Sequence, residues 1–436
     1  AYLDPAYGAI DTSIDLGSGD DQAWIDADAE GNLSAVVEAT GLESSTLDGA
    51  SGVDSLDLSA RARGDVATAT GTSDSLIVLG NAEQAAGNGD SLEIWTMANG
   101  VSAATAIALD GSTVIAGSGA DLIDVSATAA SNADGGSLVD EALAVAVRDS
   151  SLNTGAGSDL IVLDARASGA TTLAIGALNS TINSGTGDDS LVVNATTNDN
   201  LYVDPAYAVQ NSSLLLGEGS DAARLSADAS GAGLIEATGL MASSLQLEGG
   251  NDDLTISAFA RSSDDQAVAV AADRSQILAG DGNDSVRLQA FQVSAIQPVQ
   301  EITETESTPL VVTPDPALAL RSSTVDLGTG DDRLTLDGGA VDSSVLGGSG
   351  QDLLRLQGVS QTDLTFTRIG ESASYDLSYN FGGRNFKLRV DSVEKIETDN
   401  GSVDLDTTVA AQSAAPVSSG GSKKKSKPKP KRAKRR

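Results

Sequence analysis

Short stretches in which apolar and polar residues alternate run along most of the chain. Residues 160–168 are a clear example, because Ile161, Leu163, Ala165 and Ala167 are separated by single residues. A period of two is typical of a half-buried β-strand. No comparable stripe with the period of an α-helix is present. The pattern therefore predicts an all-β protein.

These stretches belong to a repeat. Each copy begins with Ser or Thr and a branched apolar residue, continues after two variable positions with Gly-x-Gly-x-Asp, and ends in alternating apolar positions. Eleven copies are recognisable, among them 13–25, 113–125, 151–163 and 181–193. Their turn aspartates are mostly 30 to 38 residues apart, which suits one supersecondary unit per repeat. Each unit predicts a short strand, a glycine turn, a second strand and an Ala-rich third segment.

Stacked units of this kind would bury a continuous ladder of Leu, Ile, Val and Ala. The low aromatic content of 3% also suits a core made of thin layers. We expect a right-handed parallel β-solenoid of about 11 coils, with neighbouring strands about 4.8 Å apart and a total length of roughly 50 Å. The protein would be a rod.

A longer duplication lies over the short repeat, because residues 1–62 closely match 201–261. A Pro-, Glu- and Thr-rich stretch then interrupts the repeat, and an aromatic-rich stretch and a Lys/Pro-rich stretch follow it. The expected organisation is therefore a first solenoid super-repeat at 1–200, a second at 201–296, a loop at 297–316, final solenoid coils at 317–360, a small C-terminal β cap at 361–406, and a disordered linker with a basic tail at 407–436.

The charge is strongly negative and unevenly distributed. The chain has 62 acidic and 26 basic residues, and ten of the basic residues lie within 423–436, so the body carries 16 − 62 = −46. So large a charge opposes compaction unless it is spread over a long surface or neutralised by cations. A body without Lys/Arg clusters is not expected to bind nucleic acid.

Several classes of chemistry are excluded by residues that the chain lacks. It contains no Cys and no His, so disulfides, thiol catalysis and the commonest transition-metal ligand are absent. No apolar run reaches the 18 or more residues that predict a membrane span.

The glycine turns are the best candidate for a binding site. Glycine permits left-handed backbone angles, and the following Asp adds a carboxylate at a constant offset. Stacked turns would form a column of oxygen ligands, which suits Ca²⁺ better than the strictly octahedral Mg²⁺. Without a cation, a column of unpaired carboxylates would repel. The alternative is that each Asp only caps its own turn through backbone amides.

The turns resemble those of RTX proteins, the haemolysin-type calcium-binding repeats. Residues 347–356 (GGSGQDLLRL) match the consensus Gly-Gly-x-Gly-x-Asp-x-Leu-x-Leu almost throughout, and residues 391–397 (DSVEKIE) are similar to the ending that often follows such repeats. The resemblance covers the turns and not the nine-residue period of that family. It implies calcium bound by turn carbonyls and by the carboxylates of Asp21, Asp54, Asp121, Asp159, Asp189, Asp221, Asp253, Asp284, Asp332 and Asp352.

We therefore expect a secreted, non-catalytic protein with a structural or adhesive role at the bacterial cell surface, folded with the help of calcium. The basic tail at 423–436 would anchor it to an anionic partner, which could be a cell-surface polymer, nucleic acid or the acidic solenoid of a neighbouring copy. The alternative is a tail that only solubilises the chain or serves in its processing. Self-assembly is a further expectation. One alternative is a polysaccharide-acting β-helix enzyme (a lyase, an epimerase or a glycosidase), although no carboxylate pair stands apart from the repeat. Another alternative is a glycan-binding module.

Overall fold

The computed structural model describes residues 5–32, 34–80, 89–131, 140–200, 204–264, 266–294, 316–370 and 373–405. Strands make up nearly all secondary structure in these ranges, with one short 3₁₀ turn, η1 (Gln361–Asp363), so the all-β prediction is confirmed. Within the same ranges, no helix has the length and hydropathy that crossing a membrane requires. The predicted loop at 297–316 lies outside the described residues apart from Pro316, and the tail at 407–436 lies wholly outside them.

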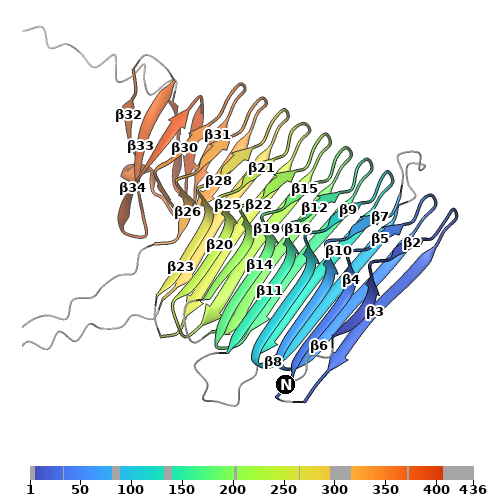
Figure 1. Ribbon diagram of the computed structural model, residues 1–436. Coiled ribbons are helices and arrows are strands. Elements are labelled where there is room, and N and C mark those ends of the chain that lie inside the picture. The colour runs from blue at the N-terminus through green and yellow to red at the C-terminus, as the bar shows by residue number, and fades with distance from the viewer. Residues whose placement is uncertain are drawn as a thin grey trace, which may run out of the picture.

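The strands pair in parallel and form long ladders, to which each repeat contributes in turn (Figure 1). The first ladder holds the strands that follow the glycine turns. In order, it contains β3 (Gln22–Glu30), β6 (Ser55–Ser73), β8 (Ser91–Asp110), β10 (Leu122–Ser131), β13 (Leu160–Ser168), β16 (Ser190–Asn200), β19 (Ala222–Gly231), β22 (Asp253–Ser262), β25 (Ser285–Val293), β28 (Arg333–Asp337) and β31 (Leu353–Leu356).

The second ladder holds the Ala-rich segments. The long strands β6 and β8 take part in both ladders, because each continues from the first into the second past a register shift. The other members are β1 (Ala6–Ile10), β4 (Val36–Glu43), β11 (Glu141–Arg148), β14 (Thr171–Leu178), β17 (Asp204–Gln210), β20 (Ile235–Met241), β23 (Ala267–Asp273), β26 (Leu318–Arg321) and β29 (Gly339–Val341).

The third ladder consists of short strands that precede the glycine turns. Its members are β2 (Ser13–Asp15), β5 (Thr46–Asp48), β7 (Leu76–Val78), β9 (Thr113–Ile115), β12 (Ser151–Asn153), β15 (Thr181–Asn183), β18 (Ser213–Leu215), β21 (Ser244–Gln246), β24 (Gln276–Leu278), β27 (Thr324–Asp326) and β30 (Ser343–Leu346).

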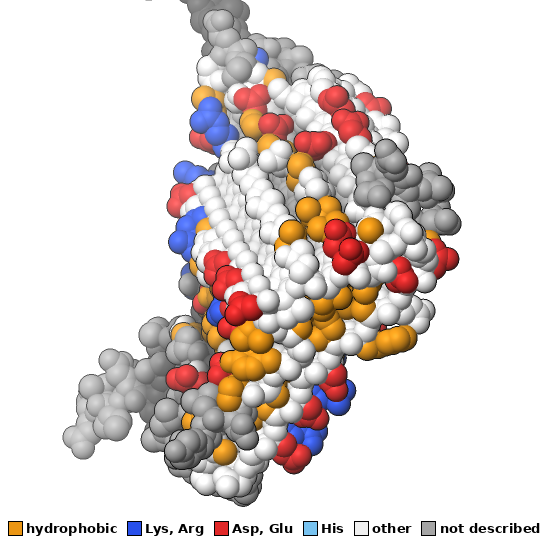
Figure 2. Space-filling view, turned by 45° about the vertical axis from the view of Figure 1, so that its right-hand side comes forward, with side chains coloured by type: hydrophobic (Ala, Val, Ile, Leu, Met, Phe, Trp, Pro, Cys, Tyr) orange, Lys and Arg blue, Asp and Glu red, His pale blue; other side chains and the backbone are white. Residues whose placement is uncertain are grey.

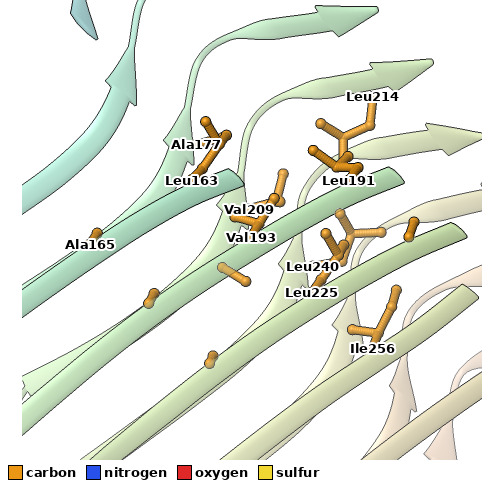
Figure 3. Packing of buried hydrophobic residues seen from close by; sticks show 14 of the residues in the cluster. Leu163, Ala165, Ala177, Leu191, Val193, Val209, Leu214, Leu225, Leu240 and Ile256 are labelled. Atoms are coloured by element: carbon orange, nitrogen blue, oxygen red, sulfur yellow. The ribbon is translucent and has the colours of Figure 1, made fainter. Parts of the chain in front are cut away.

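The alternating apolar positions face inward and form one continuous core. Val193, Leu225 and Ile256 are register neighbours on successive strands of the first ladder, and all three are fully buried. Figure 3 shows such side chains packing with Val209 and Leu240 of the second ladder. Apolar burial of this kind is the main favourable contribution to folding, and the period-two pattern places it on one face of every strand.

The C-terminal end of the ladders is covered by antiparallel strands. β34 (Arg384–Asp391) extends the third ladder from β30, and β35 (Lys395–Thr398) extends the first from β31. β33 (Ser374–Phe381) pairs antiparallel with β34 and with β32 (Thr365–Arg368), and β36 (Gly401–Asp404) pairs antiparallel with β35.

The first repeat has no such cover among the described residues. β1, β2 and β3 each pair with a strand of the next repeat only. Ile14 and Ile25, whose duplicated counterparts Leu214 and Leu225 are fully buried, are only half-buried here. Trp24 on β3 is 71% exposed. The same sequence pattern thus packs less completely at this end, because within the described residues these strands have a neighbouring repeat on one side only.

Candidate functional site

One aspartate from every repeat lies in a single column at the turn between the third and first ladders. Each member ends its turn and lies directly before the following strand. Eight of the turns have the full Gly-x-Gly-x-Asp pattern, and those of Asp54, Asp90 and Asp252 depart from it. All but the half-buried Asp21 are at most 3% exposed. We call this set the aspartate column: Asp21, Asp54, Asp90, Asp121, Asp159, Asp189, Asp221, Asp252, Asp284, Asp332 and Asp352.

Nine of the ten ligands predicted from the sequence lie in this column, and Asp253 does not. Asp253 is exposed at the start of β22, and the neighbouring Asp252 takes its place. The offset arises because Glu248, with φ of 72°, occupies the position of the first turn glycine. Two adjacent glycines, Gly249 and Gly250, conceal that substitution in the sequence.

Asp90 is a column member that is not among the ligands predicted from the sequence. The signal was present, since Gly89 and Asp90 end a recognisable turn before the apolar alternation of β8. The backbone N–H of Asp90 donates to Asp121 Oδ1 over 2.7 Å.

The carboxylates bond from one repeat to the next. The backbone N–H of each member donates to Oδ1 of the member in the following repeat; for example, the Asp121 N–H donates to Asp159 Oδ1 over 2.8 Å. At the C-terminal end, the N–H of Asp352 donates to Glu394 Oε2 over 2.8 Å. Each aspartate therefore caps the turn of its neighbour and not its own, which differs from the expected Asx-turn alternative.

The second carboxylate oxygen has no such partner in nine members. Their Oδ2 atoms are buried and accept no hydrogen bond from the described residues. A buried polar atom without a partner is costly, and a buried charge costs more. The nine members are Asp21, Asp54, Asp121, Asp189, Asp221, Asp252, Asp284, Asp332 and Asp352.

Burial also raises the pKa of most column carboxylates, which makes them harder to ionise. For Asp189, burial raises the pKa most, the N–H of Asp159 opposes this, and the charges of neighbouring carboxylates raise it further. The pKa is raised to about 6 for Asp221 and Asp352, and to about 7 for Asp121, Asp189, Asp252 and Asp332. Close like charges in a poorly solvated site favour uptake of protons or binding of cations.

The turn glycines stack as closely as the aspartates. Gly155 and Gly157 have φ of 98° and 149°, in the region that favours glycine. A Cβ atom on Gly157 would lie 1.3 Å from the carbonyl oxygen of Gly119 in the preceding repeat, and one on Gly155 would lie 1.8 Å from that of Gly117. Backbone carbonyls are thus stacked against glycine Cα atoms, and no larger residue fits there.

The donor set suits a hard cation. Across the described ranges, no three acidic side chains converge on one point, so each repeat offers one carboxylate. A cation at the column would therefore take its other ligands from turn carbonyls. Ca²⁺ accepts six to eight oxygen ligands in tolerant geometry, including carboxylate and backbone carbonyl oxygens. The unpaired Oδ2 atoms fit that role.

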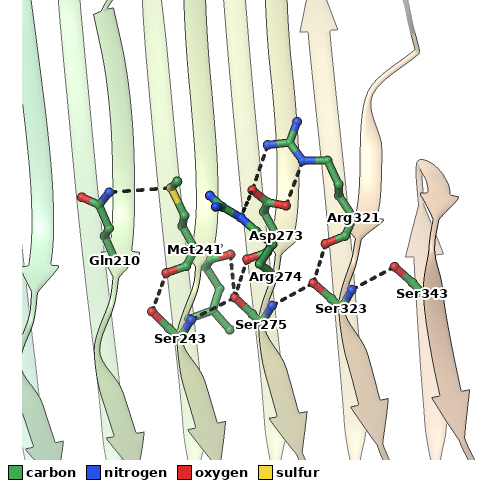
Figure 4. Close-up of polar contacts among 10 residues, drawn as sticks. Gln210, Met241, Ser243, Asp273, Arg274, Ser275, Arg321, Ser323 and Ser343 are labelled. Atoms are coloured by element: carbon green, nitrogen blue, oxygen red, sulfur yellow. Dashed lines mark hydrogen bonds and ion pairs between the residues drawn. The ribbon is translucent and has the colours of Figure 1, made fainter.

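In a second column, of serines, every hydroxyl both donates and accepts a hydrogen bond. Ser275 N–H donates to Ser323 Oγ over 3.1 Å, and Ser323 Oγ donates to the Arg321 carbonyl over 2.8 Å (Figure 4). This column was not predicted from the sequence, although a Ser before or at the start of each short strand is a signal for it. Its members are Ser45, Ser75, Ser112, Ser150, Ser180, Ser212, Ser243, Ser275, Ser323 and Ser343. Of the two columns, only the aspartate column has buried oxygen atoms, the Oδ2 atoms, that lack a hydrogen-bond partner in most members. The aspartate column is therefore the candidate site.

Comparison with known proteins adds no further guide. No protein-family model matches the chain, and no curated protein matches it.

Proposed function

We propose that the chain is a right-handed parallel β-solenoid that binds calcium along the aspartate column and has a structural or adhesive role at the bacterial cell surface after secretion. The solenoid is supported by the return of the chain to the same three ladders in every repeat. The calcium proposal depends on one observation above all, the row of buried Oδ2 atoms without partners.

Calcium would solve the electrostatic problem of the column. Its positive charge offsets carboxylates that burial and mutual repulsion otherwise keep from ionising. Two successive members, such as Asp189 and Asp221, would each contribute Oδ2, while Oδ1 stays bonded to the N–H of the preceding repeat. These hydrogen bonds to Oδ1 already orient each carboxylate before a cation binds.

The surface role is supported by the repetition and by the charge. Acidic side chains lie in several separate patches along the face seen in Figure 2. An acidic, repetitive rod is suited to covering a cell surface and to holding other components at a distance from it. The proposed role involves no catalytic step. The basic tail at 423–436, which lies outside the described residues, is proposed as the anchor to anionic surface polymers.

Calcium titration of the full chain tests the proposal. We expect calcium to raise the melting temperature followed by circular dichroism, chelation to lower it, and calorimetry to count several sites. Asp189→Asn should lower the number of bound ions or their affinity. Asp188→Asn is the matched control, because Asp188 is adjacent but bonds the Ser220 N–H at the exposed surface. Unchanged melting after chelation, together with no calcium uptake, would refute the calcium proposal.

A further inference from the structure

A pocket lies where the ladders become narrower near the C-terminal strands. β25 is nine residues long, but its neighbour β28 pairs only with Ser285–Gln289. Residues 290–293 therefore have no strand beside them on that side among the described ranges. The tip of the β33–β34 hairpin, at Phe381 and Gly382, closes part of this space. The remaining cavity has a volume of about 390 Å³, within the range of small-ligand sites.

Aromatic rings are concentrated at this pocket. The whole chain has five phenylalanines, and Phe259, Phe291 and Phe381 all line the cavity. Phe259 and Phe291 are register neighbours on β22 and β25, and Phe291 is 53% exposed. The repeat does not need an aromatic residue here, since Thr196 and Asp228 occupy the same position in the two preceding repeats.

The polar wall of the pocket has unused capacity. The carboxylate of Asp337 is half-buried and has no hydrogen bond or close ion pair with any residue that the structure describes. Burial raises its pKa, and the more distant charge of Arg287 only partly opposes this. Beside it, Gln289 is its register neighbour and is held by bonds to Ser257 Oγ (2.7 Å) and from Arg287 Nε (3.1 Å). An apolar ligand alone would leave the Asp337 carboxylate desolvated without compensation.

We infer that this pocket binds a glycan. A pyranose has an apolar C–H face that stacks on an aromatic ring and hydroxyl groups that donate to a carboxylate, so it matches both walls at once. The ring of Phe291 would carry the sugar face, and Asp337 would accept its hydroxyl protons. A neutral glycan is favoured over a uronate, because both Asp337 and the net charge of −36 repel an anion.

This inference rests on the proposed surface role, for which it supplies the partner, but it uses none of the calcium ligands. The pocket lies on the outer side of the first ladder, and its lining includes no column member. Loss of calcium binding and loss of glycan binding are therefore separate results.

The test uses the full chain in calcium buffer with neutral tetrasaccharides (cellotetraose and chitotetraose) and tetragalacturonate. Saturation-transfer NMR should show contacts to ring C–H protons of a neutral tetrasaccharide, and calorimetry should give its affinity. Phe291→Ala and Asp337→Asn should each weaken binding about tenfold or more. Trp24→Ala, which removes an exposed ring at the other end of the ladders, should leave the affinity unchanged.

The inference is overturned if none of these sugars binds, or if both pocket variants bind as well as the parent chain. It is also overturned if sedimentation shows self-association that Phe291→Ala abolishes, because the pocket would then hold a second copy of the chain. Calorimetry with calcium on the same samples shows independently whether the proposed function stands.

Discussion

The backbone N–H of Asp352 donates to Glu394 Oε2 over 2.8 Å, and this bond ends the aspartate column. Glu394 belongs to the segment before β35, so a residue of the C-terminal antiparallel region takes the role that the next aspartate has elsewhere. The column is therefore closed at this end by a longer acidic side chain. At the other end, Asp21 is only half-buried and receives no N–H from a preceding repeat among the described residues.

The first prediction concerns this closing bond. Glu394→Ala leaves the buried N–H of Asp352 without its acceptor, so we expect a loss of about 1–3 kcal/mol in the free energy of unfolding. Glu394→Gln keeps an acceptor oxygen and should retain most of that stability. Denaturant unfolding measures both variants, and equal stability of the two would show that the bond contributes nothing.

The second prediction concerns pH. Six column carboxylates have pKa values raised to about 6 or 7, chiefly by burial, whereas an unfolded Asp titrates near about 3.9. Between those values the folded protein binds more protons than the unfolded chain, so its stability falls as pH rises from about 4 to about 7. In a chelator, the melting temperature should therefore be higher at pH 5 than at pH 8.

Calcium should change this dependence, because it competes with protons for the same oxygens. It should stabilise the protein strongly at pH 8 and weakly at pH 5. Asp189→Asn removes a buried titrating carboxylate and should flatten the slope seen in chelator. Asp188→Asn should flatten it less, because Asp188 only adds to the pKa of Asp189 and Asp221 through its charge. A melting temperature that rises with pH in chelator would contradict the raised pKa values.

The third prediction concerns the glycine stack. Gly157→Ala places a Cβ atom 1.3 Å from the Gly119 carbonyl oxygen and cannot be accommodated without separating two repeats. Gly370→Ala is the control, because its φ is also positive but no atom lies within 4 Å. The control should cost about 1–2 kcal/mol from backbone strain alone. Hydrogen exchange should show that Gly157→Ala opens the neighbouring turns, and a cost equal to that of the control would refute the close stacking.

The fourth prediction concerns the core. Leu225→Ala should cost about 2–5 kcal/mol, because Leu225 is fully buried between Val193 and Ile256 on adjacent strands. Arg224→Ala, at the neighbouring exposed position, should change stability by less than about 0.5 kcal/mol. Thermal unfolding compares the two. Similar effects at both positions would mean that the period-two assignment of faces is wrong.

Most of the fold could be predicted because its signals are local. The alternation at Ile161, Leu163 and Ala165 identifies a strand and its buried face within a few residues. The column was also predictable, since equal turns at equal spacing place one Asp per repeat. The sequence could not show that Asp252, and not Asp253, belongs to the column. The first turn position requires a positive φ, which usually indicates glycine, but here Glu248 adopts it.

The pocket at Phe291 was beyond sequence reasoning for a different reason. Its walls come from Phe259, Asp337 and Phe381, which lie far apart along the chain and meet only because β28 is shorter than β25. Nothing in the local sequence marks the difference in length between β25 and β28, so no motif predicts the pocket.

The sequence alone determined the all-β character, the repeat and the presence of a turn aspartate in nearly every unit, because these depend on contacts within a few residues. Only the tertiary structure decided that Oδ1 of each column carboxylate accepts an N–H from the preceding repeat while, in most members, Oδ2 stays buried and unpaired. The bonding partner of each turn in the column is 20 to 48 residues away, so its geometry exists only once the repeats are stacked.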